Sequence, residues 1–303
     1  MKKRIFKRNN SALAGVLEAL LLIGLVAIIL STIQLYYVPD IMEQKESEHM
    51  DQVANQFSQL KSTIEIQSMM GVLEPDKPIA HSPMSSPITL GSDKLSYFVT
   101  SWALGNIEII DKDATESIIE ILPAVSVPDY INGIPLTSIK YNAYNHYYLE
   151  GRSLSYILEA GGVILKQSDG ESMKVAPPII AENKSNSINF IYSIPVFVSK
   201  PGKNISPTKI DDAYIRTNYS TSYTHTESNI NQIYIHTDYT SAWNQTLIAD
   251  DSGILWEYYN NGYINVNYNN PTRIEITPGT KHIDVELTIV ELGVQTGPGV
   301  VNP

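Results

Sequence analysis

The apolar run from Ser11 to Tyr37 constrains the fold of this chain more than any other feature, because Glu18 is its one charged residue. A helix of about 20 apolar residues is long enough to cross the ~30 Å hydrocarbon core of a bilayer. A secretory signal peptide has a shorter apolar core of about 7–15 residues, followed by a small-residue cleavage site. No Ala-x-Ala signal follows this run. We therefore expect a transmembrane helix over residues 11–37.

Five basic residues crowd the segment before this run: Lys2, Lys3, Arg4, Lys7 and Arg8. Positive charges beside a membrane helix stay on the cytoplasmic side, so residues 1–10 are expected to form a basic cytoplasmic leader. Tyr36 and Tyr37 stand at the other end of the run, where aromatic side chains anchor a helix at the membrane surface. The expected localisation is the cell membrane, with one span in contact with membrane lipid, a cytoplasmic N-terminus and an extracellular C-terminal domain.

The rest of the chain is strongly acidic. The leader holds five of the 21 basic residues and none of the acids, which leaves 16 basic against 32 acidic side chains beyond it. Nucleic-acid binding depends on neutralising phosphates with Lys and Arg, so we expect no nucleic-acid partner. The chain has no cysteine, which excludes disulfides and thiolate chemistry and leaves core burial to stabilise the exported domain.

A second helical segment, the stalk, is expected over residues 38–70. Pro39 lacks an amide donor and either kinks the helix or starts a new one. Apolar residues then recur at helical spacing, and Gly71 is the expected end of the helix. The recurring apolar residues are Met50, Val53, Phe57, Leu60 and Ile64. This stripe packs on the following domain in one interpretation, and in the other it forms a seam between copies of the helix, as in a filament.

Residues 71–292 are expected to form a β-rich extracellular domain. Tyr outnumbers Phe by 19 to 5, which suits strands with one wet face. Short apolar or alternating segments between turn residues such as Gly161-Gly162 indicate strands. These segments are 117–122, 154–160, 163–167, 188–198 (a strand pair or one bent strand), 263–268, 273–277 and 282–290.

Three segments depart from the strand pattern. Residues 74–92 contain four prolines and suggest a linker or an irregular edge. One short helix is expected around Thr240–Ala249, and residues 293–303 are expected to be a flexible tail. The predicted fold class is α+β: a long N-terminal transmembrane and stalk helix, then a mainly antiparallel, sandwich-like β domain with one short helix.

Several segments resemble archaeal type IV pilin-like proteins. Arg8-Asn-Asn-Ser-Ala-Leu-Ala-Gly15, running directly into the apolar helix, resembles the class III signal peptide of that family. Other segments are similar to blocks in its members with large β-rich ectodomains: 148–152, 156–165, Pro177-Pro178 and 238–243. The resemblance implies that the helix is first a membrane anchor and then part of a filament core, packed against copies of itself or other pilins.

The resemblance also implies cleavage by a prepilin-type leader peptidase. The expected cut lies between Asn9 and Asn10, and a cut a few residues further on is the alternative. The family usually has Gly or Ala just before the cut, where this chain has Asn9. An uncut leader would leave a plain anchored protein.

Glu18 is the candidate assembly residue. An isolated carboxylate in lipid costs about 3 kcal/mol even on lenient insertion scales, so it needs a partner. In bacterial pilins, a Glu early in the mature helix pairs with the free N-terminus of a neighbouring subunit. Glu18 is the fifth residue if the mature chain begins at Ala14, and the ninth if it begins at Asn10. In the alternative interpretation, Glu18 lies close enough to the cytoplasmic face to reach water or to become protonated.

No motif argues for catalysis, a metal site or a cofactor. None of the six histidines has a metal-ligand spacing, although His225, Glu227 and His236 could meet across strands. The segment from Asp111 begins like a calcium loop but lacks its turn glycine and closing Glu, so a turn explains it. Adjacent carboxylates such as those of residues 211–212 point to opposite faces of a strand. We therefore expect that the protein is not an enzyme.

The expected extracellular domain contains four N-x-Ser/Thr sequons, at Asn183, Asn204, Asn218 and Asn244. Their number on an exported face predicts N-glycosylation of at least one of them.

The sequence thus predicts a membrane-anchored, outward-facing pilin-like surface protein, for example a minor subunit of a type IV pilus-like filament. The alternative is a permanently anchored cell-surface binding module, an adhesin or glycan-binding domain, that does not polymerise. The two hypotheses differ in whether the leader is removed and in whether the outer domain binds a ligand saturably.

Overall fold

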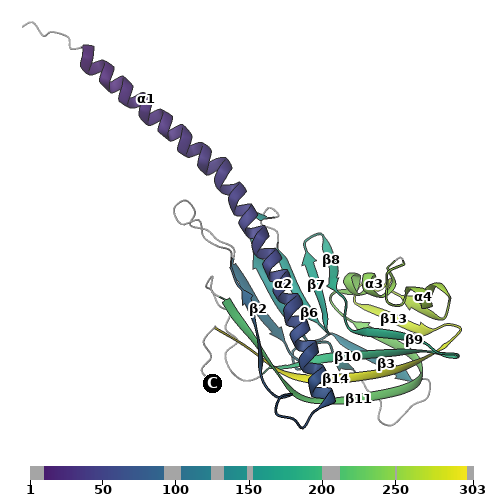
Figure 1. The fold of residues 1–303 in the computed structure, drawn as a ribbon. Coiled ribbons are helices and arrows are strands. Elements are labelled where there is room, and N and C mark those ends of the chain that lie inside the picture. The colour runs from purple at the N-terminus through teal and green to yellow at the C-terminus, as the bar shows by residue number, and fades with distance from the viewer. Residues whose placement is uncertain are drawn as a thin grey trace, which may run out of the picture.

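A computed structural model of the protein describes residues 10–91, 104–123, 133–148, 153–199, 212–249 and 251–298. Figure 1 shows a long N-terminal helix that projects from a mainly β domain and then lies across one face of that domain. The predicted order of a long apolar helix followed by an antiparallel-rich β domain is therefore confirmed.

One continuous helical rod runs from Asn10 to Leu73. Its parts are α1 (Asn10–Thr32), the π-helical turn η1 (Ile33–Tyr37) and α2 (Val38–Leu73). At 1.5 Å per residue, this rod is about 95 Å long. Pro39 lies in the first turn of α2 and cannot donate to the carbonyl of Leu35, four residues earlier. The helix widens here instead, and the amide of Val38 donates to the carbonyl of Ile33, five residues earlier.

The described strands form two sheets. Their bounds are β1 (Met84–Thr89), β2 (Leu104–Ile110), β3 (Ile118–Pro123), β4 (Ile134–Pro135), β5 (Ser138–Tyr144), β6 (Leu154–Glu159), β7 (Gly162–Gln167), β8 (Gly170–Val175), β9 (Ile179–Asn183), β10 (Ser187–Ser199), β11 (Asp212–His236), β12 (Ile264–Asn267), β13 (Arg273–Pro278) and β14 (His282–Pro298). In the described chain, nine strands form the larger sheet in the order β12-β13-β11-β14-β10-β9, with β1 and β3 paired to β11 and β4 paired to β3. The smaller sheet has the order β2-β5-β6-β7-β8.

The predicted meander over residues 154–171 is confirmed by β6, β7 and β8, which pair antiparallel in sequence order. The first turn of this meander is Ala160-Gly161 rather than Gly161-Gly162, because Gly162 is already the first residue of β7. Both turn residues have positive φ, 49° and 81°, as the tightest hairpin turns require.

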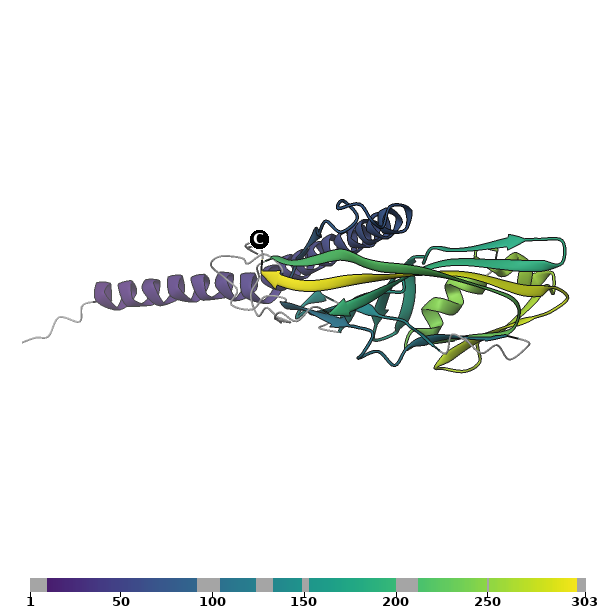
Figure 2. The same cartoon turned by 90° about the horizontal axis from the view of Figure 1, so that it is seen from below.

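The long strands β11 and β14 run side by side along the larger sheet (Figure 2). The segment 188–198 is a single strand, β10, and not a pair. It pairs with β14 in parallel, which is an exception to the otherwise antiparallel pairing of the described strands.

The apolar stripe of α2 is buried in the domain. Its members Met50, Val53, Phe57, Leu60 and Ile64 are each at most 2% exposed. They share a core with the smaller sheet, with β1 and with the paired ends of β11 and β14. The interpretation that the stripe packs on the following domain is therefore confirmed, and the stripe cannot also be a seam between copies.

A second core lies on the other part of the larger sheet. It is covered by α3 (Thr240–Ile248) and α4 (Trp256–Asn260), and Trp243 is fully buried in it. The helix α3 confirms the short helix expected around Thr240–Ala249. The five residues of α4 form a further helical turn that was not expected.

Two sequence-based boundaries are wrong. The stalk helix ends at Leu73 and not at residue 70, so Gly71 does not terminate it. Residues 293–298 belong to β14, where they pair with the start of β11, and the expected tail can begin only beyond the described residues. For residues 74–92, the edge alternative agrees better with the structure than the linker, because β1 within them pairs with β11 alone among the described strands.

An aromatic ring occupies the space beside Gly71 and leaves no room for a larger side chain at this position of the helix. A Cβ built at Gly71 would lie 2.1 Å from Cδ2 of Tyr219, a side chain that is itself buried. A glycine inside a helix costs about 1 kcal/mol relative to alanine. The close contact with Tyr219 explains why glycine and not alanine occupies this position.

We expect Gly71→Ala to lower the free energy of unfolding by about 2–3 kcal/mol, because overpacking at the helix–sheet contact outweighs the better helix propensity of alanine. Gly24→Ala is the matched control, since a Cβ at Gly24 meets nothing within 4 Å. Denaturant unfolding of both variants in detergent tests this. A Gly71→Ala protein as stable as the Gly24→Ala protein would contradict the packing argument.

Candidate functional site

The first half of the helical rod is bare. Its large apolar side chains between Val16 and Leu30 are 46–75% exposed. This is the one helix of the described chain that is long and apolar enough to cross a membrane, which is compatible with a membrane anchor. Glu18 is exposed on this helix, and Asn10 is its first residue. Asn9, the other residue of the expected cleavage site, lies outside the described residues.

Where the rod meets the domain, a buried carboxylate fixes it. Glu46 is fully buried on α2 and accepts hydrogen bonds from three successive backbone amides after β5. The amides of His146, Tyr147 and Tyr148 lie 3.1, 2.8 and 2.6 Å from its Oε2. A cradle of consecutive N–H groups is a site where a protein can hold a buried negative charge.

Further polar contacts follow the same face of α2 toward its end. Nε2 of His49 lies 2.9 Å from the hydroxyl oxygen of Tyr141, which is buried in the smaller sheet. The amide nitrogen of Gln67 donates to the carbonyl of Thr217 on β11, at 3.1 Å. These bonds join α2 to both sheets.

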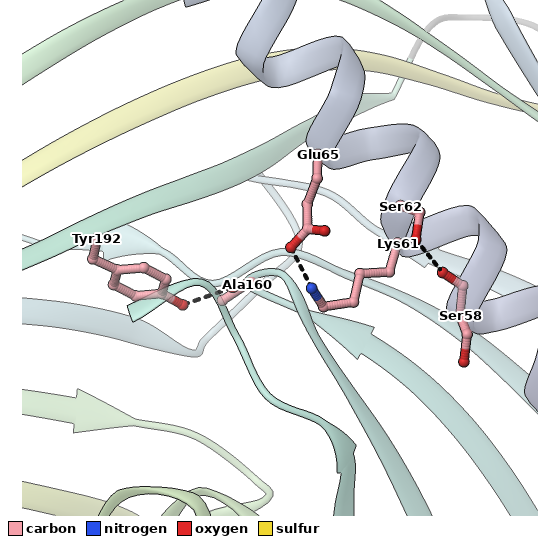
Figure 3. Close-up of polar contacts among 6 residues, drawn as sticks. All are labelled: Ser58, Lys61, Ser62, Glu65, Ala160 and Tyr192. Carbon is pink, nitrogen blue, oxygen red and sulfur yellow. Dashed lines mark hydrogen bonds and ion pairs between the residues drawn. The ribbon is translucent and has the colours of Figure 1, made fainter. Parts of the chain in front are cut away.

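An ion pair stands at the edge of this contact. Lys61 is nearly buried and pairs with Glu65 one turn further along α2. Figure 3 shows Lys61 reaching toward Glu65 above the turn that carries Ala160, whose carbonyl accepts a hydrogen bond from the hydroxyl of Tyr192 at 2.7 Å.

An open groove of about 460 Å³ lies beside this end of α2, lined mostly by apolar side chains such as Met69 and Leu73.

The strongest candidate for ligand chemistry is a second buried carboxylate, Glu159, at the end of β6. It is 2% exposed. Its Oε1 accepts one hydrogen bond from the hydroxyl of Thr237 at 2.7 Å and another from the indole nitrogen of Trp243 at 2.9 Å. Thr237 directly follows β11 and Trp243 lies on α3, so Glu159 ties the smaller sheet to the end of β11 and to the helix after it.

Glu159 also lines a polar cavity of about 220 Å³. Four segments meet there: the β2–β3 connection, the start of β5, the end of β6 and the β11–α3 connection. The lining residues are Ile110, Ala114, Thr115, Glu116, Ser117, Ser138, Glu159, Asp238 and Tyr239. We call this the Glu159 cavity.

Burial raises the pKa of Glu159 to about 7. The hydrogen bonds from Trp243 and Thr237 act in the opposite direction, while the nearby carboxylates of Asp238 and Glu171 add to the increase. The carboxyl group therefore changes its charge near neutral pH.

Of the three residues considered for metal chemistry in the sequence, His225 and Glu227 meet, but His236 pairs elsewhere. Nε2 of His225 lies 3.2 Å from Glu227, whereas His236 bonds Glu120 on β3 at 3.3 Å. No group of three His, Asp or Glu side chains in the described chain could hold a metal ion. Asp111 caps a turn, with its Oδ1 accepting the amides of residues 113 and 114, as the turn interpretation expected. Of the adjacent pair at residues 211–212, the first lies outside the described residues.

The four sequons lie in different surroundings. Asn183 is exposed at the start of the β9–β10 turn, where its Oδ1 accepts a hydrogen bond from Lys281. Asn218 is half-buried within β11, and its side chain donates to the carbonyl of Tyr219. Asn244 lies on α3 with its Oδ1 buried. Asn204 lies outside the described residues.

Sequence reasoning missed both buried carboxylates. For Glu46 a signal existed, because continuing the α2 stripe backward by helical spacing reaches Glu46 and Met42. For Glu159 the signal was a charged residue at the end of a strand whose other members are almost all apolar. Its two hydrogen-bond donors lie about 80 residues away in the sequence, so only the fold could identify them.

Comparison with protein-family models, with curated proteins and with solved structures finds no match to this chain.

We expect Glu159→Gln to stabilise the protein above neutral pH. The wild-type carboxyl has a pKa of about 7 when folded against an ordinary value of 4.5, so its contribution is fully present below pH 4.5 and is lost as the pH rises through 7. The loss is about 3 kcal/mol at most, and glutamine keeps an oxygen for Trp243 and Thr237 without a charge to bury. Denaturant unfolding from pH 5 to 9 should show the variant gaining on the wild type up to about pH 7, with the difference levelling off above that pH. A constant difference between the two would contradict a titrating Glu159.

We expect Asn183 to carry a glycan when the native host glycosylates the protein, and Asn218 and Asn244 to carry none. A glycan needs an exposed, accessible acceptor, which of the three only Asn183 offers. Glycopeptide mass spectrometry, with Asn183→Gln compared with Asn218→Gln, measures the occupancy of each position. An occupied Asn244 in the folded protein would contradict this expectation.

Proposed function

We propose that this protein is a membrane-anchored, outward-facing, pilin-like surface protein without enzymatic activity, which forms a minor subunit of a type IV pilus-like filament. The observation that carries the proposal is the division of one continuous helix into two halves. One half is apolar and bare, and the other half is packed into a β domain.

The exposed apolar half of the helix must be shielded from water. Soluble monomers rarely expose contiguous apolar patches larger than a few hundred Å², and α1 is apolar on all sides, with Glu18 as its one charged side chain among residues 14–37. Membrane lipid covers such a helix before assembly, and like helices of neighbouring subunits cover it afterwards. Because lipid is as apolar as another helix, packing and polar pairing must drive the exchange.

In the proposed sequence of events, a prepilin-type peptidase first removes the class III leader at Asn9–Asn10 or a few residues later. The apolar helix then leaves the membrane for a bundle of like helices, where Glu18 finds a partner that lipid cannot provide. The glycosylated, sandwich-like β domain stays on the extracellular side and coats the filament. The rigid connection through α2 supports this arrangement, because it holds the domain at a fixed place on the helix.

A permanently anchored adhesin is the second candidate function, and one feature of the surface favours it. A polar hollow of about 370 Å³ is lined by the last residue of β12, Asn267, by two asparagines of the β12–β13 loop, and by Arg273 and Glu275. The guanidinium of Arg273 also lies over the ring of Tyr234, 4.7 Å from its centre. Amide, guanidinium and carboxylate groups beside an aromatic ring are suited to binding sugar hydroxyls. Saturable glycan binding by an uncut protein would favour this candidate.

We expect Glu18→Gln to insert into the membrane normally and to impair filament assembly. If the pairing contributes about 2–3 kcal/mol, its loss lowers incorporation into filaments by roughly one to two orders of magnitude. Glu43→Gln is the matched control, because Glu43 is an exposed carboxylate on α2 outside the apolar run. Labelled filaments are counted on cells, and the N-terminus of the mature protein is read by mass analysis.

Two results would contradict the filament proposal. One is a mature protein that retains Met1 or Lys2, since an uncut leader leaves a permanent anchor. The other is the recovery of the full-length protein from the aqueous fraction without detergent, which would remove the membrane anchor itself.

A further inference from the structure

The Glu159 cavity has an unbalanced charge. Three carboxylates line it, from Glu116, Glu159 and Asp238, and none of the lining residues that the structure describes is basic. One lysine contacts the lining, because Nζ of Lys166 lies over the ring of Tyr239, 5.1 Å from the ring centre. The cavity therefore favours a positively charged occupant.

Glu159 is more than a structural link between the sheets. Trp243 and Thr237 both donate to Oε1, and no residue that the structure describes donates to Oε2. A glutamine would accept the same two bonds without the cost of burying a charge. Glu159 as a whole is 2% exposed and lines the cavity, so its second oxygen can accept from a donor placed there.

The spacing of the oxygens argues against a metal ion as the occupant of the cavity. A divalent cation needs several oxygens at about 2.0–2.6 Å from one point, and the described residues hold no group of carboxylates close enough to provide them. A primary ammonium group needs three acceptors at ordinary hydrogen-bond distances instead. Four residues with oxygen-bearing side chains line the cavity: Glu159, Ser138, Glu116 and Asp238, of which the last two are exposed.

We propose that the Glu159 cavity binds a primary ammonium group, with Glu159 as the buried acceptor and the carboxylates of Glu116 and Asp238 guiding the cation inward. The group belongs either to a small free amine or to a lysine side chain of another protein. This inference goes beyond the proposed filament function and does not depend on whether the protein polymerises.

Binding should depend on pH, because only the ionised carboxylate attracts the cation. The groups that face Glu159 are Tyr192 on β10, Tyr239 and Asp238 beyond β11, and Glu171 on β8. Burial raises the pKa of both tyrosines, so they stay neutral. With a pKa of about 7 for Glu159, its ionised fraction rises about tenfold from pH 6 to pH 8.

The test is calorimetric titration of the full-length protein in detergent with n-butylamine, whose ammonium is protonated at both pH values. We expect saturable binding at pH 8 and about tenfold weaker binding at pH 6. Tetramethylammonium at equal ionic strength has no N–H donor and should not compete. An acetylated and amidated Gly-Lys-Gly peptide distinguishes the sources, since binding of the peptide alone indicates a lysine of another protein and binding of the amine alone indicates a free ligand.

Glu159→Gln should reduce the affinity at least tenfold, which corresponds to about 1.4 kcal/mol. The matched control is Glu227→Gln, which removes one carboxylate outside the cavity. The proposal is overturned if neither probe binds saturably at pH 8, if Glu159→Gln binds as tightly as the control, or if tetramethylammonium competes equally. Calcium binding in place of amine binding would also overturn it. The denaturant unfolding experiment described above shows whether the Glu159→Gln variant is folded before its amine binding is measured.

Discussion

The docking of α2 against both sheets is the interaction on which the rest of the structure depends. Burying a large apolar side chain contributes about 1.5–3 kcal/mol, so the five stripe residues together contribute on the order of 10 kcal/mol. A domain of this kind is stable by about 5–15 kcal/mol in total. The helix therefore cannot leave the domain while the domain stays folded, and the direction of the bare half is set by the packing of the other half.

One polar contact and one steric contact fix the position of the helix within that docking. Glu46 finds its three amides at one end, and any shift of the helix along its axis would leave a buried carboxylate without donors, at a cost of several kcal/mol. At the other end, the ring of Tyr219 leaves room only for a glycine, which is Gly71. The two points are 25 residues apart, about 37 Å along a helix. Apolar packing alone tolerates sliding by a turn, whereas these two contacts allow one register.

Local sequence patterns predicted most of the elements. The ends of some elements and the Glu159 cavity could not be predicted, because they depend on contacts between distant segments. The bare helix, the α2 stripe, the 154–171 meander and α3 could all be predicted from periodicity and turn residues. The end of α2 could not, because Gly71 is a typical helix end until Tyr219 is placed beside it. The last residues of β14 look like a tail until the start of β11 pairs with them. The Glu159 cavity depends on four distant segments, so no local pattern indicates it.

Three glutamates stand in apolar surroundings, and each is satisfied to a different degree within the chain. Glu46 accepts from three backbone amides, so its charge is compensated inside the fold. Glu159 accepts two hydrogen bonds on one oxygen and keeps the other for the cavity. Glu18 lies on a bare helix, where no described residue is close enough to bond it. Because an uncompensated carboxylate is costly in an apolar medium, the need for an outside partner rises in this order, which parallels the structural role of Glu46 and the roles proposed for Glu159 in ligand binding and for Glu18 in assembly.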